Sequence, residues 1–208
     1  MDPLAAGSIT RWHGTLLRDI RDDVVGRFRQ GNEWVRVGSH LGANPAFVPD
    51  LVAAALERYE RHEFASDLEA IAWFHCEFEI LHTFVDGNGR IGRALINKQL
   101  QDLGLPPVIV RAKGRQRDYY PMLEQYSKTD KYAGVLRLLS LLLQESLHKR
   151  IAMVTSRRII PLAEWARNAD VCGNVAANRA RRQTIPAFRV RDRWMIASEY
   201  DESAASAG

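Results

Sequence analysis

Apolar residues recur three and four positions apart through most of the first 155 residues, which is the spacing of amphipathic helices. Five such stretches stand out: from Ile9, from about Pro49, from Ser66 to His82, from Gly89 to Gly104, and from about Lys131 to Met153. The first carries Trp12, Leu16, Leu17, Ile20 and Val24, the second Val48, Leu51, Val52, Ala55, Leu56 and Tyr59, and the last Val135, Leu136, Leu139, Leu143 and Leu147.

The ends of these stretches carry their own signals. Ser66 and Glu69 have the spacing of a capping box, so the third helix should begin there and end at His82. Residues 1–8 are small and unpatterned and predict a loose end. Residues 33–46 mix β-branched residues with glycine and proline and predict a short hairpin, while residues 117–120 open a further helical stretch. We therefore predict an all-α body of about six helices.

The pattern changes in residues 157–197. A helix is expected near Leu162–Asn168, a turn at 171–173, a second helix at about 174–182, and a hairpin of 185–190 with 194–196. Two short helices, a tight turn and a hairpin wing form a winged helix-turn-helix. The segment resembles excisionase-like and MerR-like DNA-binding modules. We predict a domain at 155–198 after a main domain at 9–153.

Composition, with 46% hydrophobic and 26% charged residues, is that of an ordinary soluble protein. No apolar run approaches a membrane span, and the start Met1-Asp2-Pro3-Leu4 lacks the order of a signal peptide, so we expect a cytoplasmic protein with no membrane partner. Cys76 and Cys172 lie far apart without metal-ligand spacing and are expected to be free thiols.

Charge is unevenly placed along the chain. Residues 155–197 hold nine arginines against three acidic residues, Glu164, Asp170 and Asp192, although the whole chain has a net charge of only +4. This asymmetry points to a polyanionic partner for the C-terminal part. In a winged helix-turn-helix the recognition helix would carry Asn178, Arg179, Arg181 and Arg182, and the wing would bring Arg189, Arg191 and Arg193 to phosphates. We therefore predict binding to double-stranded DNA; the alternative is a basic tail that packs on the main domain or on an acidic protein.

The richest chemistry lies in the stretch His82-Thr83-Phe84-Val85-Asp86-Gly87-Asn88-Gly89-Arg90-Ile91-Gly92-Arg93. Its glycines let backbone amides converge on an anion, and the helix that follows offers its N-terminus to phosphate. His82 can take a proton, Asp86 can hold a hard divalent cation, and Arg90 and Arg93 can neutralise phosphate oxygens. These parts predict a phosphoryl- or nucleotidyl-transfer site.

Other interpretations of this stretch fit less well. A Walker A loop requires a Gly-Lys-Ser/Thr end, and a calcium loop requires an acceptor at Arg90 and a glutamate at Asn97. A plain turn between two helices is a further alternative. A transition-metal site is also conceivable, because His75, Glu79 and His82 lie on one helix face.

The same twelve residues resemble the signature of the Fic family, His-Pro-Phe-x-Asp/Glu-Gly-Asn-Gly-Arg-x-x-Arg, with Thr83 in place of the proline. The resemblance covers roughly residues 9–150, including a Gly-x-Phe-Arg segment at 26–29 and a histidine, His75, seven residues before His82. It implies a Fic-type helical bundle with a short hairpin flap that pairs with a target protein. It also implies Mg²⁺-dependent transfer of AMP from ATP to a Ser, Thr or Tyr hydroxyl of that target.

The resemblance also assigns roles by position. His82 would be the general base, Asp86 would hold Mg²⁺, and Gly87, Asn88 and Gly89 would form the anion hole. Arg90 and Arg93 would hold the leaving pyrophosphate, while Phe84 would anchor the loop. The paired tyrosines Tyr119 and Tyr120 would approach the nucleotide base, although we expect at least one of them to be core. Thr83 should affect the rate more than the chemistry, since proline would have fixed the loop entry.

Two alternatives and one regulatory expectation accompany this interpretation. Doc-like relatives phosphorylate their target, and a DNA-binding regulator could keep a Fic body without activity. Many Fic proteins carry an inhibitory helix with the pattern Ser/Thr-x-x-x-Glu-Gly/Asn, whose nearest candidate here, Ser198 to Glu202, is followed by serine. We therefore expect inhibition, if any, to come from a separate antitoxin-like chain that supplies a glutamate to Arg93.

Overall fold

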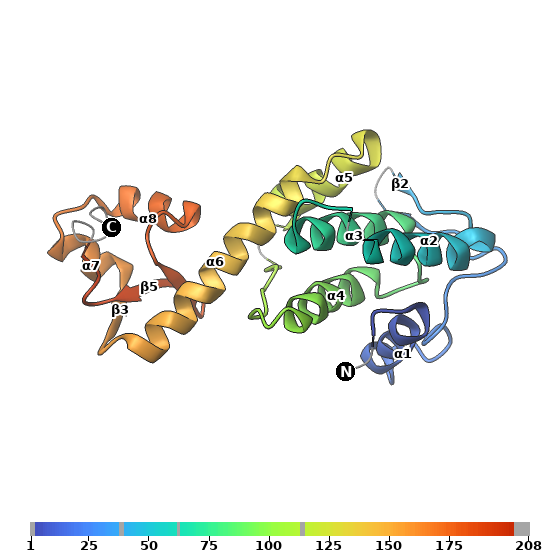
Figure 1. Ribbon diagram of the computed structural model, residues 1–208, viewed down its shortest axis with the longest axis horizontal. Coiled ribbons are helices and arrows are strands. Elements are labelled where there is room, and N and C mark those ends of the chain that lie inside the picture. The colour runs from blue at the N-terminus through green and yellow to red at the C-terminus, as the bar shows by residue number, and fades with distance from the viewer. Residues whose placement is uncertain (1–2, 38–39, 62, 113–114, 202–208) are drawn as a thin grey trace. The chain divides into compact units, whose positions relative to one another are not determined.

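The computed structural model describes residues 3–37, 40–61, 63–112 and 115–201 (Figure 1). Contacts divide the chain into two compact units. The N-terminal unit comprises Met1–Leu105 and Ile109–Leu139, and the C-terminal unit comprises Pro106–Val108 and Ser140–Gly208. The division falls inside a long helix, α6, and the functional domain limits predicted at 153–155 remain predictions.

The N-terminal unit is mostly helical, as predicted. Its elements are α1 (Ala6–Leu17), the strands β1 (Arg36–Val37) and β2 (His40–Leu41), a 3₁₀ turn at Pro45–Phe47, α2 (Val48–Glu60), α3 (Asp67–Leu81), α4 (Asn88–Asp102), a π-helical turn at Arg115–Tyr119, α5 (Tyr120–Thr129) and the start of α6 (Ala133–Thr155). The strands pair antiparallel, Arg36 with Leu41 and Val37 with His40, which confirms the predicted hairpin. Its central residues, 38–39, lie outside the described residues.

Helix α3 is the core of this unit, and α2, α4 and α5 pack against it. Its start is the predicted capping box: the Ser66 hydroxyl accepts from the Glu69 amide, and the Glu69 carboxylate accepts from the Ala65 amide. Ile71, Ala72 and Cys76 are fully buried in it. The helix ends at Leu81, so His82 follows it directly. Both cysteines are free, Cys76 buried and Cys172 exposed.

The N-terminal predictions need two corrections. Helix α1 starts at Ala6 and buries Ser8 and Ile9, so the loose end is shorter than predicted. The helix also stops at Leu17, since Asp19 adopts a left-handed φ of 63° and its amide donates to the Asp22 carboxylate. Ile20, expected on the buried face, is 59% exposed. The aspartates cap a turn that competes with helix, which the apolar spacing alone does not reveal.

The C-terminal unit has the elements predicted for it. Helices α7 (Leu162–Asn168) and α8 (Gly173–Arg182) precede a hairpin of β4 (Phe188–Val190) and β5 (Arg193–Ala197). The short Ile159-Ile160 run becomes a third strand, β3 (Ile159–Pro161), which gives an antiparallel sheet with the order β3-β5-β4. A separate core fills this unit and is built from Ile160, Leu162, Trp165, Ala166, Ala176, Ala180, Ile185, Ala187 and Ile196.

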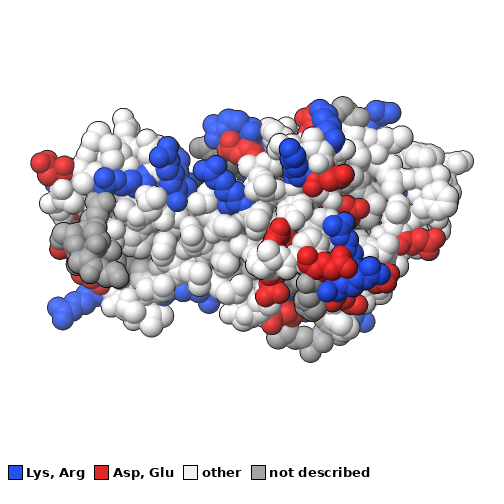
Figure 2. Space-filling view, turned by 45° about the horizontal axis from the view of Figure 1, so that its top comes forward, with Lys and Arg blue, Asp and Glu red and all other residues white. Residues whose placement is uncertain are grey.

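On the face drawn in Figure 2, basic side chains predominate on the C-terminal unit, whereas the N-terminal unit shows both signs. Arg181 and Arg182 are exposed on α8, and Arg191 and Arg193 are exposed in the hairpin. Arg189, also in the hairpin, packs within its own unit, and its predicted contact with phosphate stays a prediction. Its guanidinium pairs with Glu145 at 3.3 Å and lies 4.0 Å above the Trp194 ring, so it serves the packing of this unit. No helix in the described ranges is both long and apolar enough to cross a membrane.

Candidate active site

A cavity of about 690 Å³ opens in the N-terminal unit beside the motif. Its walls come from β2, the end of α3, the loop before α4, the start of α4, and the segment 115–127. The lining contains nearly the whole set of motif residues predicted for nucleotide binding: His82, Asp86, Gly87, Asn88, Gly89, Arg90, Arg93, Tyr119 and Tyr120. Phe84 is the exception, because it is fully buried behind the loop.

His82 is held in an unusual backbone conformation at the end of α3. As the C-cap residue it has φ 52° and ψ 61°, in the left-handed region. Its Nδ1 lies 3.1 Å from the Glu79 carbonyl oxygen, which can only accept, so Nδ1 carries the proton and Nε2 is left as an acceptor. Burial lowers the pKa of His82, and the charges of Arg29 and His40 lower it further, against the opposing Glu79 carbonyl. At neutral pH His82 is therefore a base.

The loop between α3 and α4 is closed by the side chain of Asn88. Its Oδ1 accepts from the Phe84 amide at 2.8 Å, and its Nδ2 donates to the Phe84 carbonyl at 2.7 Å. The buried Thr83 hydroxyl donates to the same Oδ1 at 3.4 Å. Gly87 then turns the chain into α4 with φ 82°, where a Cβ would lie 3.0 Å from Leu17 Cδ1. Asn88 thus shapes the loop as well as lining the cavity.

His13, which the sequence interpretation did not single out, supports the loop from α1. Its Nδ1 accepts from the Gly26 amide at 3.1 Å, so Nε2 carries the proton that it donates to the Asp86 carbonyl at 2.9 Å. Its ring stacks on Phe84 with centroids 3.7 Å apart. Burial lowers the pKa of His13 and favours the neutral form that this pattern requires. The only signal in the sequence was one polar residue between apolar positions of α1.

The start of α4 fits a phosphate group. No side chain caps this helix, because its N-cap is Gly87, and the first amides of a helix have no intrahelical acceptor. The Arg93 guanidinium folds back over this end, where a Cβ on Gly89 would lie 3.0 Å from Nη1. The site thus combines open amides with a cation.

Asp86 fits a hard divalent cation. Its side chain is 41% exposed, lines the cavity, and accepts from the Gly87 amide at 2.5 Å and from Arg90 Nη2 at 3.2 Å. These bonds leave lone pairs on a carboxylate beside the anion-binding amides. Magnesium typically takes one or two carboxylates together with substrate phosphates, so this donor set is sufficient.

Glu79 is a second carboxyl group in the cavity wall, and its side chain is only 8% exposed. Its Oε1 has no hydrogen-bond partner, lies 4.0 Å from His75 Nε2, and leaves no room for a Cβ on Gly92. Burial raises the pKa of Glu79 to about 7, although the charges of Arg93 and Arg115 oppose the shift. A carboxyl group of this kind titrates near neutrality.

The transition-metal alternative fails on the same residues. His75 Nε2 bonds to the Tyr119 hydroxyl at 2.5 Å, and His82 Nδ1 bonds to a carbonyl. Within the described ranges no group of three or more His, Cys, Asp and Glu residues could hold a metal ion. Burial lowers the pKa of His75 to about 4, so it is a neutral core histidine.

The paired tyrosines divide as expected. Tyr119 is buried, 3% exposed, and ties the 115–119 turn to α3 through His75. Tyr120 is 40% exposed and presents its ring to the cavity. Arg115 and Gln116 line the cavity beside them. The residues predicted to contact DNA belong to the C-terminal unit.

Comparisons with known proteins agree with this geometry. Residues 3–100 match the model of the Fic/DOC family. The "Protein adenylyltransferase Fic" of Drosophila persimilis is 34% identical over 125 residues, which are 59% of this chain and 24% of the relative. The protein of the same name from Drosophila melanogaster is 35% identical over 125 residues, with shares of 59% and 25%. The chain thus spans about a quarter of the length of these curated relatives.

Solved structures show the same fold. A Fic-domain-containing signalling protein from Bacteroides thetaiotaomicron superposes with a TM-score of 0.64 at 22% identity, covering 72% of this chain and 63% of that one. A Fic family protein from Desulfovibrio desulfuricans also has a TM-score of 0.64, at 20% identity, and covers 97% of this chain and 71% of that one. At these identities the likeness concerns the fold alone.

Proposed function

From the premise that this chain carries a Fic/DOC family domain, distantly related to protein adenylyltransferases, we propose that it transfers AMP from ATP to a hydroxyl side chain of a target protein. The observation that carries the proposal is the meeting, in one cavity, of a neutral histidine, a carboxylate, uncapped helix amides and two arginines. Each of these groups has a distinct task in nucleotidyl transfer.

His82 is the proposed general base. With Nδ1–H directed to the Glu79 carbonyl, Nε2 accepts the proton of the target hydroxyl. The oxygen then bonds to the α-phosphorus of ATP, the bond to the β-phosphate breaks, and pyrophosphate leaves. Because burial keeps the imidazole neutral, His82 is ready to accept this proton at physiological pH.

The phosphates are proposed to bind at the start of α4. Its first amides and Gly89 would cradle phosphate oxygens, while Arg90 and Arg93 would neutralise the leaving pyrophosphate. Asp86 would hold Mg²⁺, which supplies positive charge against the phosphates when bound. Tyr120, with Tyr119 behind it, would border the nucleotide base. Thr83 fills the position of the family proline and is fully buried.

The protein partners are proposed from the same site. The β1–β2 hairpin, whose His40 lines the cavity, would pair with the backbone of the target. Arg93 would be the point of control, because a glutamate supplied by a separate antitoxin-like chain could pair with it in place of phosphate.

One assay decides between the enzyme classes. The purified chain is incubated with Mg²⁺, a lysate, and ATP labelled either at the α- or at the γ-phosphate. We expect protein-bound label from α-labelled ATP only. Label from γ-labelled ATP would instead identify a Doc-like kinase, and absence of both would favour a DNA-binding regulator with a non-catalytic Fic body.

A second function, binding of double-stranded DNA, is proposed for the C-terminal unit. The observation that favours it is the exposed arginine set on α8 and the β4–β5 hairpin, Arg181, Arg182, Arg191 and Arg193, on a helix–turn–helix and hairpin arrangement. Arg181 is pre-oriented by a 2.7 Å bond to Asn178. Arg179, beside them on α8, would also face the groove, whereas Arg189 would contribute indirectly through the hairpin it supports.

We expect the full chain to bind duplex DNA with an affinity that falls steeply as salt rises, because arginines release condensed counterions. Changing Arg181 and Arg182 to alanine should lower the slope of log K against log[salt] by about 0.9 per lost phosphate contact. Fluorescence anisotropy at several salt concentrations measures it. Arg117→Ala, which removes an exposed charge of the N-terminal unit, is the matched control. No binding at low salt would give the basic set another role.

A further inference from the structure

Arg29 is a fully buried cation that bonds to backbone carbonyls, and it lies directly behind His82. Only 1% of the residue is exposed. Its Nε donates to the His82 carbonyl at 2.5 Å, and Nη2 donates to the carbonyls of Leu81 at 3.1 Å and Ala43 at 2.5 Å. Its Nη1 donates to the Glu33 carbonyl at 3.0 Å.

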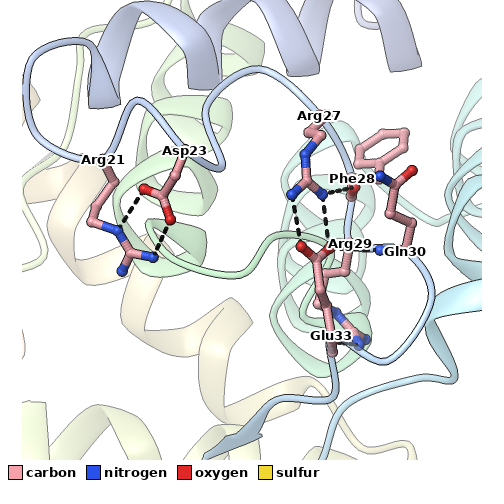
Figure 3. Close-up of polar contacts among 7 residues, drawn as sticks. All are labelled: Arg21, Asp23, Arg27, Phe28, Arg29, Gln30 and Glu33. Atoms are coloured by element: carbon pink, nitrogen blue, oxygen red, sulfur yellow. Dashed lines mark hydrogen bonds and ion pairs between the residues drawn. The ribbon is translucent and has the colours of Figure 1, made fainter.

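The nearest carboxylate serves a different arginine. Figure 3 shows Glu33 in a bidentate pair with Arg27, at 2.6 and 2.7 Å, while it also accepts from the Gln30 amide. These bonds, with Arg27 first, lower the pKa of Glu33 to about 2. The Arg27–Glu33 pair closes the loop from which Arg29 projects. Figure 3 also shows a separate surface pair, Arg21 with Asp23. Arg29 is therefore presented by a rigid loop, with its charge directed to carbonyls.

Two of the four carbonyls that Arg29 binds, those of Leu81 and His82, lie at the C-terminal end of α3. The Leu81 carbonyl also accepts from the Ala43 amide at 3.2 Å. The last carbonyls of a helix have no intrahelical donor, and a left-handed residue such as His82 requires support from its surroundings. The Arg29 guanidinium donates hydrogen bonds to the carbonyls of Leu81 and His82 and links them to the carbonyl of Ala43, just after β2. The backbone at Gly42 packs closely on this arrangement, because a Cβ there would lie 3.0 Å from His82 Cβ and 3.1 Å from Arg29 Nη2.

The charge of Arg29 acts on the imidazole as well as on the backbone. It lowers the pKa of His82, in addition to burial and to the charge of His40 on β2. The other charged or titratable residues that line the cavity with His82 come from α3, the motif loop, α4, the 115–119 turn and α5: Glu79, Asp86, Arg90, Arg93, Arg115, Tyr119, Tyr120 and Glu124. Arg29 approaches from the opposite side, through the His82 backbone.

We infer that Arg29 is a positioning residue that fixes the left-handed turn of His82 and holds its imidazole in the proton-accepting form. This inference deepens the proposed function, since it concerns the same base. The Arg29 guanidinium joins three segments: the loop at 27–33, the end of α3 and the residues just after the hairpin. The positive charge of Arg29 should affect the His82 pKa, whereas the geometry of its hydrogen bonds should affect the position of the imidazole.

The test is an NMR titration of the His82 imidazole in the full chain. In Arg29→Gln we expect the pKa of His82 to rise, because the positive charge is gone. In Arg29→Lys the charge remains and the His82 pKa should stay near the wild-type value. Arg21→Gln is the matched control, since it removes an exposed positive charge that pairs with Asp23 and does not contact the loop pair or His82. The titration needs no transfer activity, so it decides the inference even if the proposed reaction is wrong.

Kinetics separate positioning from charge. Arg29→Lys should lower kcat for transfer on the order of 10²-fold through misplacement of His82, with the nucleotide Kd unchanged. In Arg29→Gln the pH below which kcat declines should rise by the same amount as the His82 pKa measured by NMR. An unchanged His82 pKa in folded Arg29→Gln, or an equal shift in Arg21→Gln, overturns the inference. If Arg29→Gln does not fold, a wild-type kcat in Arg29→Lys overturns it.

Discussion

Replacing His82 by alanine is expected to lower the rate of AMP transfer by at least about 10²–10⁴-fold, the usual contribution of a positioned general base. The side chain reaches the cavity from the end of α3, where its Nδ1 is committed to the Glu79 carbonyl. Alanine leaves no group at this position to accept the hydroxyl proton. The phosphate-binding parts at α4 are not touched, so the Kd for ATP with Mg²⁺ should change little.

The measurement pairs single-turnover transfer of α-labelled ATP with calorimetric nucleotide binding. Ser127→Ala is the matched control, because Ser127 also lines the cavity but its hydroxyl donates to the Glu124 carbonyl of its own helix at 2.8 Å. It should retain most of the transfer rate. Wild-type turnover in the His82 variant would exclude the general-base assignment, whatever its effect on stability.

The local structure of the motif could be predicted because its residues are adjacent in sequence and act locally. The capping box at Ser66, the helix that ends at His82 and the glycine loop into α4 all follow from short-range rules, and the structure confirms these elements. The same is true of the C-terminal helices and hairpin. Local rules failed where a polar turn competed with apolar spacing, as at Asp19.

The supporting residues could not be predicted, because each acts on a partner far away in sequence. His13 bonds to the backbone of Asp86, and Arg29 bonds to the carbonyls at the end of α3. In the sequence one is a polar residue on an apolar face, and the other belongs to a short Gly-x-Phe-Arg segment. Only the packing of α1 and the 27–33 loop against the motif shows that both bind the backbone of the motif.

Replacing Glu79 by glutamine is expected to raise stability above neutral pH. Burial raises the folded-state pKa of Glu79 from 4.5 to about 7. Below pH 4.5 the carboxyl is protonated in both states. As pH rises from 4.5 to about 7, the unfolded chain releases the proton while the folded chain keeps it, so the stability of the wild type falls over this range and levels off above it. Glutamine mimics the protonated form and does not titrate.

The difference in unfolding free energy between Glu79→Gln and wild type should therefore grow from near zero at pH 4.5 to about 3 kcal/mol at pH 8. Urea titrations at several pH values measure it. His75 gives the opposite slope, since its folded-state pKa is lowered from 6.5 to about 4 and its contribution rises with pH over that range. In the wild type the two slopes largely cancel, whereas the glutamine variant should gain stability as pH rises.

Glu124→Gln is the control for this experiment. Glu124 also lines the cavity, but its exposed carboxylate pairs with Lys128 at 2.7 Å, and this hydrogen bond lowers the Glu124 pKa. A lowered carboxyl pKa contributes stability that is present above the unfolded pKa and lost as pH falls, so the Glu124 variant should show a small difference of the opposite sign. A pH-independent difference for Glu79→Gln would mean that the carboxyl is already ionised and paired at neutral pH. The Arg93 and Arg115 charges would then outweigh burial, and Glu79 would be a fixed anion beside the proposed phosphate site.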